Sequence, residues 1–203
     1  MGAWRERVGA DATLGAQQLS EAELLAIVQE AGRHGLKVAA HAHGTEGIKA
    51  AVRAGVASIE HGSMIDDEAA ALMKQQGTYL VPTAYLLGTF KFESLPPPIA
   101  AKARQVVPMA QESHRRAIRP GVRIAFGTDA AVAPHGENAR EFAVYVGYGM
   151  RPAEAIRTAT LNAAELLGVS DRGVMAPGKL ADLIAVRGYP LEDVRVLDRC
   201  PGS

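Results

Sequence analysis

Residues 37 to 55 read KVAAHAHGTEGIKAAVRAG, and this stretch decides the fold that the sequence predicts. Residues 37–40, which are apolar except for Lys37, predict a short buried strand that leads directly into His41 and His43. Thr45 is a residue type that caps helices, so a helix is expected from there to about Gly55. A short buried strand followed at once by a helix is the repeating unit of a parallel sheet.

A helix is expected before this stretch, and the same strand–helix unit recurs after it. Upstream, Ser20 and Glu23 have the spacing of a capping box, which predicts a helix over 21–34. Downstream, strands are expected at 57–60, 79–81 and 122–126, and helices at 66–77 and 99–118. Strands that are short and apolar on both faces predict a buried parallel α/β sheet, of either the doubly wound or the barrel type. No glycine-rich phosphate loop follows any strand, which argues against a nucleotide-binding fold.

The pattern changes after the fourth strand. Two further helices are expected at 137–148 and 152–167, and a boundary is placed near residue 168. Strands are then expected at 181–186 and 194–197, outside the strand–helix rhythm. A terminal segment of this length is too short for a core of its own. We therefore expect three parts, which are a loop or severed element at 1–19, the strand–helix repeats at 20–168, and strands of a small composite β-sandwich at 169–203.

Composition narrows the classes of partner. The 22 basic and 22 acidic side chains cancel, so no strong field of one sign is available to hold nucleic acid or an anionic membrane. No apolar stretch reaches the length of a membrane span, and the N-terminus has no apolar signal core. Cys200 is the single cysteine, so a disulfide within the chain is excluded. A soluble, cytoplasmic protein is expected, and any metal must be held by His, Asp or Glu.

Polar residues that suit a metal site follow three of the predicted strands. His41 and His43 follow the first strand, His61 the second, and Asp129 the fourth. The carboxyl ends of parallel strands share one face, which is where barrel folds place their active sites. Imidazole and carboxylate are zinc ligands, and zinc lowers the pKa of a bound water from about 15.7 to about 7. Asp129 would then be the general base.

Other interpretations of these residues stay open at this point. Each histidine alone is compatible with a hydrogen-bonded structural role, and Gly-Thr-Asp at 127–129 is compatible with a helix-capping turn. His41 and His43 point to the same side of the strand, and only one of them need bind metal. Tyr85 is a candidate hydrogen-bond donor to substrate, and His135 lies in a loop. His34 and His114 are expected to be solvated, because His34 ends a helix and His114 lies in a charged helical stretch.

Several strings, taken in order, resemble the second half of the amidohydrolase superfamily, close to its prolidase-like and imidazolonepropionase-like members. The strings are VAAHAHG at 38–44, SIEHG at 58–62, FGTDA at 126–130, PHG at 134–136, ATLNAAELLG at 159–168 and PGKLADLI at 177–184. This resemblance implies a (β/α)8 barrel of the TIM type, of which the chain would hold strands five to eight. It also implies that one or two zinc ions bind there. His41, His61 and Asp129 would be metal ligands, Asp129 also the general base, and His43, Tyr85 and His135 would contact substrate.

The sequence also departs from the family pattern. The first-strand His-x-His pair does not occur upstream of residue 20, and Lys37 is the first lysine, so the bridging lysine of the fourth strand is missing. We therefore expect a truncated chain with weak activity of its own, which pairs with a missing N-terminal half or with a second copy. The expected reaction is metal-dependent hydrolysis of an amide-type C–N bond in a dipeptide or a cyclic amide. The alternatives are a non-catalytic fragment that binds a metal or a partner, and an unrelated α/β enzyme.

Overall fold

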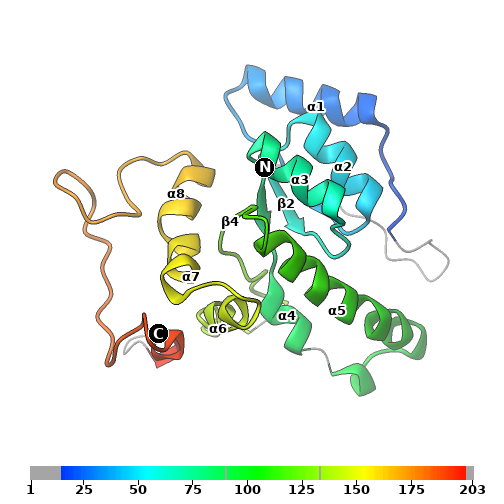
Figure 1. The fold of residues 1–203 in the computed structure, drawn as a ribbon. Coiled ribbons are helices and arrows are strands. Elements are labelled where there is room, and N and C mark those ends of the chain that lie inside the picture. The colour runs from blue at the N-terminus through cyan, green and yellow to red at the C-terminus, as the bar shows by residue number, and fades with distance from the viewer. Residues whose placement is uncertain (1–14, 90, 133, 200–203) are drawn as a thin grey trace.

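The fold is built around one four-stranded parallel sheet. The computed structural model describes residues 15–89, 91–132 and 134–199. Its strands are β1 (Ala39–Ala42), β2 (Ser58–His61), β3 (Tyr79–Val81) and β4 (Arg123–Ile124), and they lie side by side in chain order (Figure 1). All four predicted strands are present, although β4 is shorter than its apolar run. Four parallel strands in consecutive order, with helices between them, are one half of a βα barrel.

Local sequence signals explain where the first helices begin. In α1 (Glu21–Arg33) the predicted capping box is formed, with Ser20 N donating to Glu23 Oε2 at 2.9 Å and Glu23 N donating to Ser20 Oγ at 3.3 Å. In α3 (Asp67–Gln76) the Asp66 carboxylate accepts a hydrogen bond from Ala69 N at 2.7 Å. In α2 (Thr45–Ala54) the expected cap is wrong, because Thr45 is already helical and its hydroxyl donates to Met64 O at 2.6 Å.

Two of the remaining helices are not predicted by the sequence pattern. They are α4 (Ala84–Thr89) and the short 3₁₀ helix η1 (Phe92–Ser94), which follow β3 and precede the long helix α5 (Pro97–Ile118). After β4 come α6 (Arg140–Gly147), α7 (Pro152–Ala159) and α8 (Leu161–Leu167). The single helix expected over 152–167 is thus divided at Thr160, whose φ of −116° and ψ of −94° are not helical.

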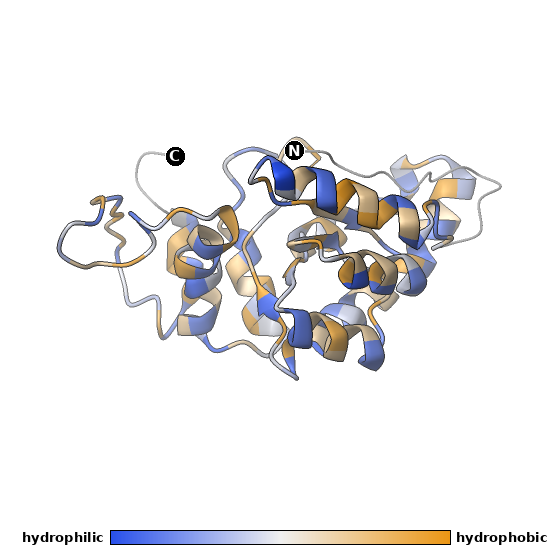
Figure 2. Cartoon of the chain, turned by 90° about the horizontal axis from the view of Figure 1, so that it is seen from above, coloured by the Kyte–Doolittle hydropathy of each residue, from blue (hydrophilic) through white to orange (hydrophobic). Residues whose placement is uncertain are grey.

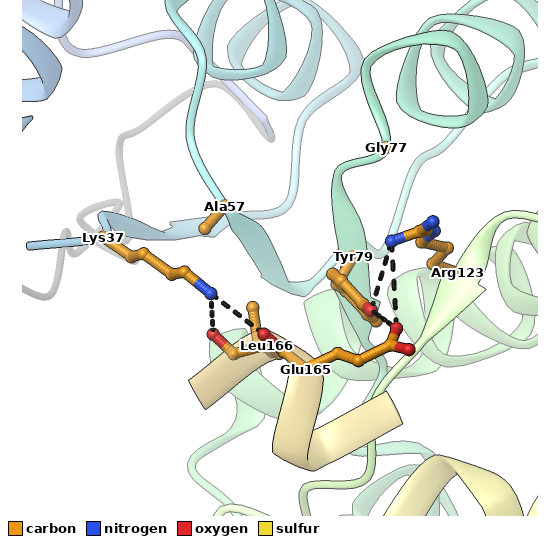
Figure 3. A pocket seen from close by; sticks show the side chains of 7 residues that line it. All are labelled: Lys37, Ala57, Gly77, Tyr79, Arg123, Glu165 and Leu166. Carbon is orange, nitrogen blue, oxygen red and sulfur yellow. Dashed lines mark hydrogen bonds and ion pairs between the residues drawn. The ribbon is translucent and has the colours of Figure 1, made fainter. Parts of the chain in front are cut away.

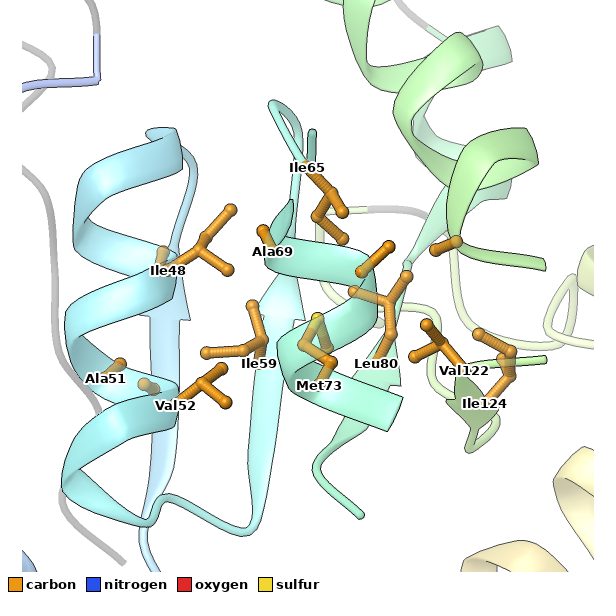
Figure 4. Close-up of a cluster of buried hydrophobic side chains, with 14 of the residues drawn as sticks. Ile48, Ala51, Val52, Ile59, Ile65, Ala69, Met73, Leu80, Val122 and Ile124 are labelled. Carbon is orange, nitrogen blue, oxygen red and sulfur yellow. The ribbon is translucent and has the colours of Figure 1, made fainter. Parts of the chain in front are cut away.

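One face of the sheet packs against helices to form the main core. Ile59 of β2 and Leu80 of β3 point to this face, where they meet Ile48 and Val52 of α2 and Met73 of α3 (Figure 4). All five side chains are fully buried, and burial of one such side chain contributes about 1.5–3 kcal/mol. Alternate strand residues point to the opposite face, where Tyr79 and Val81 pack with Leu166 of α8. The strand–helix part of the chain therefore has apolar contacts on both faces of its sheet.

The strands predicted after residue 168 are wrong. Residues 181–186 have no regular secondary structure, and Val194–Arg199 form the 3₁₀ helix η2. A strand is stable only beside a hydrogen-bonded partner, and in the described part of the chain no sheet other than β1–β4 offers one. The segment extends away from the helices (Figures 1 and 2). Apolar side chains such as Leu183 and Ile184 stay exposed. Residues 1–14 of the loop predicted at 1–19, and Cys200, lie outside the described residues.

Among the described residues, none of the helices has the length and apolar character that a membrane span requires.

Candidate functional site

Three histidines meet at the carboxyl ends of β1 and β2. His41 lies in β1, His43 follows that strand directly, and His61 is the last residue of β2. The ring centroids are 4.6 Å apart for His41 and His61, 4.7 Å for His41 and His43, and 5.1 Å for His43 and His61. The register that pairs Ala42 with His61 brings the two strand ends level. The predicted gathering of imidazoles at one end of the sheet is therefore present.

The hydrogen bonds around His61 determine which of its nitrogens carries the proton. The Thr83 hydroxyl donates its only proton to Pro82 O at 2.7 Å. Its oxygen therefore accepts from Nδ1–H of His61, also at 2.7 Å. The lone pair of His61 is then on Nε2, the form in which imidazole binds a metal. Burial, together with the neighbouring His41 and His43, lowers the pKa of His61 to about 3, so this ring is neutral at pH 7.

His43 is also held by a hydroxyl group. Its Nδ1 lies 2.7 Å from Oγ of Ser63, which is buried in the loop after β2. Burial lowers the pKa of His43, as it does that of His61. Both rings are therefore neutral near pH 7 and oriented by residues of the next strand–helix unit. The choice between His41 and His43 as the metal ligand stays a prediction, because both rings lie within 5.1 Å of His61.

Backbone strain is concentrated at the same end of the sheet. His61, Thr83 and Asp129 have positive φ values of 70°, 50° and 52°, although none of them is glycine. They follow or end β2, β3 and β4, and each such conformation costs on the order of 1–3 kcal/mol. Strain of this kind gathers at functional sites, where the surrounding structure holds it in place. The three residues thus share a location and an unusual backbone conformation.

Asp129 belongs to this end of the sheet but does not complete a metal site. Burial raises the pKa of Glu60, and the charge of Asp129 raises it further. The helix-capping alternative for Asp129 is wrong, because the next described helix, α6, begins at Arg140. Within residues 15–89, 91–132 and 134–199, no three or more His, Cys, Asp or Glu side chains are grouped so that they could hold a metal ion. The donors suit zinc by their chemistry, yet they form less than the usual set of three or four ligands.

Tyr85 lies in the first turn of α4, which follows β3, and His135 lies in the loop that follows β4. The Tyr85 hydroxyl donates to Glu137 Oε2 at 2.6 Å and accepts from Arg140 Nη1 at 2.8 Å. His135 is exposed two residues before Glu137, in the same loop. The tyrosine therefore connects α4 to the segment after β4, whereas the substrate contacts of Tyr85 and His135 stay predictions.

A buried carboxylate holds the start of α4 and was missed by the sequence analysis. Glu141 of α6 is fully buried and accepts hydrogen bonds from Ala84 N and Tyr85 N, each at 2.7 Å. Burial raises its pKa to about 7, against the opposing effect of these hydrogen bonds. The sequence feature that could have indicated its burial is the spacing of Glu141 and Tyr145, which are four residues apart and therefore on one helical face.

His114 is buried, so the expectation that it is solvated is wrong. Its exposed fraction is 1%, and its Nε2 lies 2.7 Å from the carbonyl oxygen of His61. Burial lowers its pKa to about 4. The signal was present in α5, because Val107, Ala110 and Ala117 share its face at helical spacing. His34, in contrast, is exposed as expected and pairs with Glu30 at 3.1 Å.

A cavity of about 400 Å³ lies at the opposite end of the sheet from the histidines. Lys37, which precedes β1, donates from Nζ to the carbonyl oxygens of Glu165 and Leu166 at 2.9 and 2.7 Å (Figure 3). Tyr79 donates to Glu165 Oε2 at 2.8 Å on the other side of the cavity. Its polar groups are thus used to attach α8 to the sheet, and its chemistry does not resemble that of the histidine cluster.

Comparison with known proteins gives a consistent picture. The model of the amidohydrolase family matches residues 8–200. Ochratoxinase from Aspergillus niger is 41% identical over 186 residues, which cover 88% of this chain and 38% of that protein. Imidazolonepropionase from Deinococcus deserti is 29% identical over 187 residues, which cover 88% of this chain and 42% of that protein.

Solved structures agree with these sequence matches. A Xaa-Pro dipeptidase with methionine bound in its active site superposes with a TM-score of 0.86 and 45% identity, over 90% of this chain and 47% of that one. This chain thus spans about half the length of the relatives that it matches, or less. The parallel half-barrel, the histidine cluster and these matches lead to one conclusion, which is that the chain belongs to the amidohydrolase family.

Proposed function

We propose that this protein hydrolyses an amide-type C–N bond in a small substrate, a dipeptide or a cyclic amide, with the help of a divalent metal ion such as zinc. The observation that carries the proposal is the protonation state of His61. Its imidazole is neutral, its Nδ1–H donates a hydrogen bond to the Thr83 hydroxyl, and the lone pair on Nε2 is the one that would bind a metal. Family membership supports it, as do the similar proteins named Xaa-Pro dipeptidase and imidazolonepropionase.

The proposal assigns a role to each predicted residue. His41 and His61 would hold the metal together with Asp129, and a zinc ion there would supply Lewis-acid polarisation of the substrate carbonyl. Asp129 would take a proton on its carboxylate from the attacking water and pass it to the leaving nitrogen. His43, Tyr85 and His135 would contact and orient the substrate.

The described residues alone do not complete the site. They contain no group of three or more metal-holding side chains, whereas a zinc site usually takes about three or four protein ligands. The proposal therefore requires further ligands from outside the described part of the chain, either from additional sequence or from an associating partner. We expect the 203-residue chain alone to bind zinc weakly and to turn over slowly. A cytoplasmic location is also proposed, which the single cysteine supports.

Zinc content and hydrolysis of a panel of Xaa-Pro dipeptides, measured together, test the proposal. His61→Asn should lower the zinc bound per chain, and Asp129→Asn should lower hydrolysis about 100-fold or more, as expected for loss of a general base. His34→Asn is a matched control, because His34 is exposed and paired with Glu30. Zinc binding that is equal in wild type, His61→Asn and His34→Asn would contradict the proposed site.

A further inference from the structure

Two neighbouring residues of α5 contact the backbone at the end of β2. His114 Nε2 lies 2.7 Å from His61 O, and because a carbonyl oxygen only accepts, the imidazole donates. Ser113 Oγ donates to Gly62 O at 2.6 Å and accepts from Ile65 N at 2.8 Å. Consecutive side chains of one helix thus bind consecutive carbonyl groups of the turn that carries His61.

The turn that these two residues hold is conformationally costly. His61 and Gly62 both have left-handed backbone conformations, with φ of 70° and 59°. For His61, which has a Cβ atom, this region is disfavoured by steric repulsion with the following carbonyl. Such a conformation persists only where the surrounding contacts determine it. The left-handed conformations set the orientations of the carbonyl groups of His61 and Gly62. The hydrogen bonds from His114 and Ser113 hold these two carbonyl groups in place, so they are contacts of that kind.

The surroundings of His114 point to the same role. Its ring is 1% exposed, and in the described part of the chain its Nδ1 has no hydrogen-bond partner. Burial of a polar ring is costly unless its hydrogen bonds compensate, so an apolar side chain would fill this space at lower cost. The single bond from Nε2 to His61 O is therefore the contact that distinguishes histidine from an apolar residue at this position.

We propose that Ser113 and His114 are positioning residues, which hold the His61 backbone so that its imidazole meets Thr83 and presents Nε2 to the histidine cluster. This inference rests on the proposed function, in which His61 binds a metal. It concerns a different part of the molecule, the long helix that precedes β4, and neither residue would touch the metal or the substrate.

The test compares variants that remove or retain the donor groups. His114→Leu removes the donor to His61 O, whereas His114→Gln keeps an N–H donor at a similar reach. Ser113→Ala removes the donor to Gly62 O, whereas Ser113→Thr retains it. The first readout is ¹⁵N NMR of the imidazole nitrogens in the metal-free chain, with the His61 signals assigned from His61→Asn. We expect His114→Leu and Ser113→Ala to shift the Nδ1 and Nε2 signals of His61, and the two conservative variants to resemble wild type.

Zinc affinity is the second readout. Loss of a residue that orients a ligand typically weakens metal binding about 10-fold to 100-fold, and we expect a loss at the lower end of this range for His114→Leu. Because the NMR signals are recorded without metal, they test the positioning role even if the chain proves not to bind zinc. Failure of the proposed function and failure of this inference are thereby distinguishable.

Thr78→Val is the control for a general loss of stability. Thr78 is buried and its hydroxyl donates to a backbone carbonyl, that of Val56, but it precedes β3 at the far end of the sheet. Unchanged His61 signals in both His114→Leu and Ser113→Ala, with urea stability lowered as in Thr78→Val, would overturn the inference. If His114→Leu does not fold, the test rests on Ser113→Ala. Unchanged His61 signals in Ser113→Ala would then be sufficient to reject the inference.

Discussion

The hydroxyl of Thr83 accepts the Nδ1 proton of His61 at 2.7 Å while it donates its own proton to Pro82 O. A residue that follows β3 thus determines the tautomer of the residue that ends β2. Both have left-handed backbone conformations, with φ of 70° for His61 and 50° for Thr83. The tautomer of His61 therefore depends on residues at the ends of two adjacent strands, β2 and β3, and not on the sequence motif around His61 alone.

Replacement of Thr83 by Val should change the protonation pattern of His61. The variant leaves Nδ1–H of His61 and the carbonyl of Pro82 without their partner, which typically costs about 1–3 kcal/mol for buried groups. Thr83→Ser keeps the hydroxyl and should remain close to wild type. Urea unfolding and the imidazole ¹⁵N signals measure the two effects, and identical signals in both variants would show that Thr83 does not set the tautomer.

Glu141→Gln should destabilise the attachment of α4 to α6. The carboxylate accepts from both Ala84 N and Tyr85 N, whereas the amide group of Gln has one acceptor and places N–H groups against a donor. We expect a loss of about 1–3 kcal/mol in the free energy of unfolding near pH 8, where Glu141 is ionised. Thermal unfolding should show a decrease in Tm of about 2–4 °C for each kcal/mol lost. A Tm equal to that of wild type would contradict the two-acceptor role.

The pH dependence of stability should also report on Glu141. Its pKa is about 7 in the folded chain, above the ordinary value of 4.5, so the folded state binds more protons between these pH values. The stabilisation is therefore fully present below pH 4.5 and is lost as the pH rises through 7, by up to about 3 kcal/mol. The difference in unfolding free energy between wild type and Glu141→Gln should decrease from pH 5 to pH 8. A constant difference would mean that Glu141 does not titrate in this range.

Gly62→Ala should be costly, in contrast to Gly32→Ala. A Cβ at Gly62 would lie 2.6 Å from Leu80 Cδ1 and 2.9 Å from Ile65 Cδ1, and the φ of 59° adds strain. Overpacking of this kind costs about 1–3 kcal/mol. A Cβ at Gly32, in the last turn of α1, meets no atom within 4 Å, so that variant should gain up to about 1 kcal/mol from helix propensity. Chemical denaturation of both variants checks the opposite signs.

Much of the fold could be predicted because its signals are local. The capping box at Ser20 and the short apolar runs place α1 and all four strands within a few residues of their observed bounds. The predicted strands at 181–186 and 194–197 failed because strand formation requires a partner, which an apolar pattern cannot guarantee. The prediction for His114 is wrong because Arg115 and Arg116 are its neighbours in sequence, whereas its own helical face is the apolar one.

The sequence by itself determined that strands alternate with helices and that His41, His61 and Asp129 follow strand ends. These features depend on hydrophobic spacing and chain order, which can be read from neighbouring residues. Only the tertiary structure decided the tautomer of His61, the burial of His114 and the role of Glu141. Each of these depends on a hydrogen bond between residues 22 to 57 positions apart, and such bonds form only when strand register and helix packing bring the partners within about 3 Å.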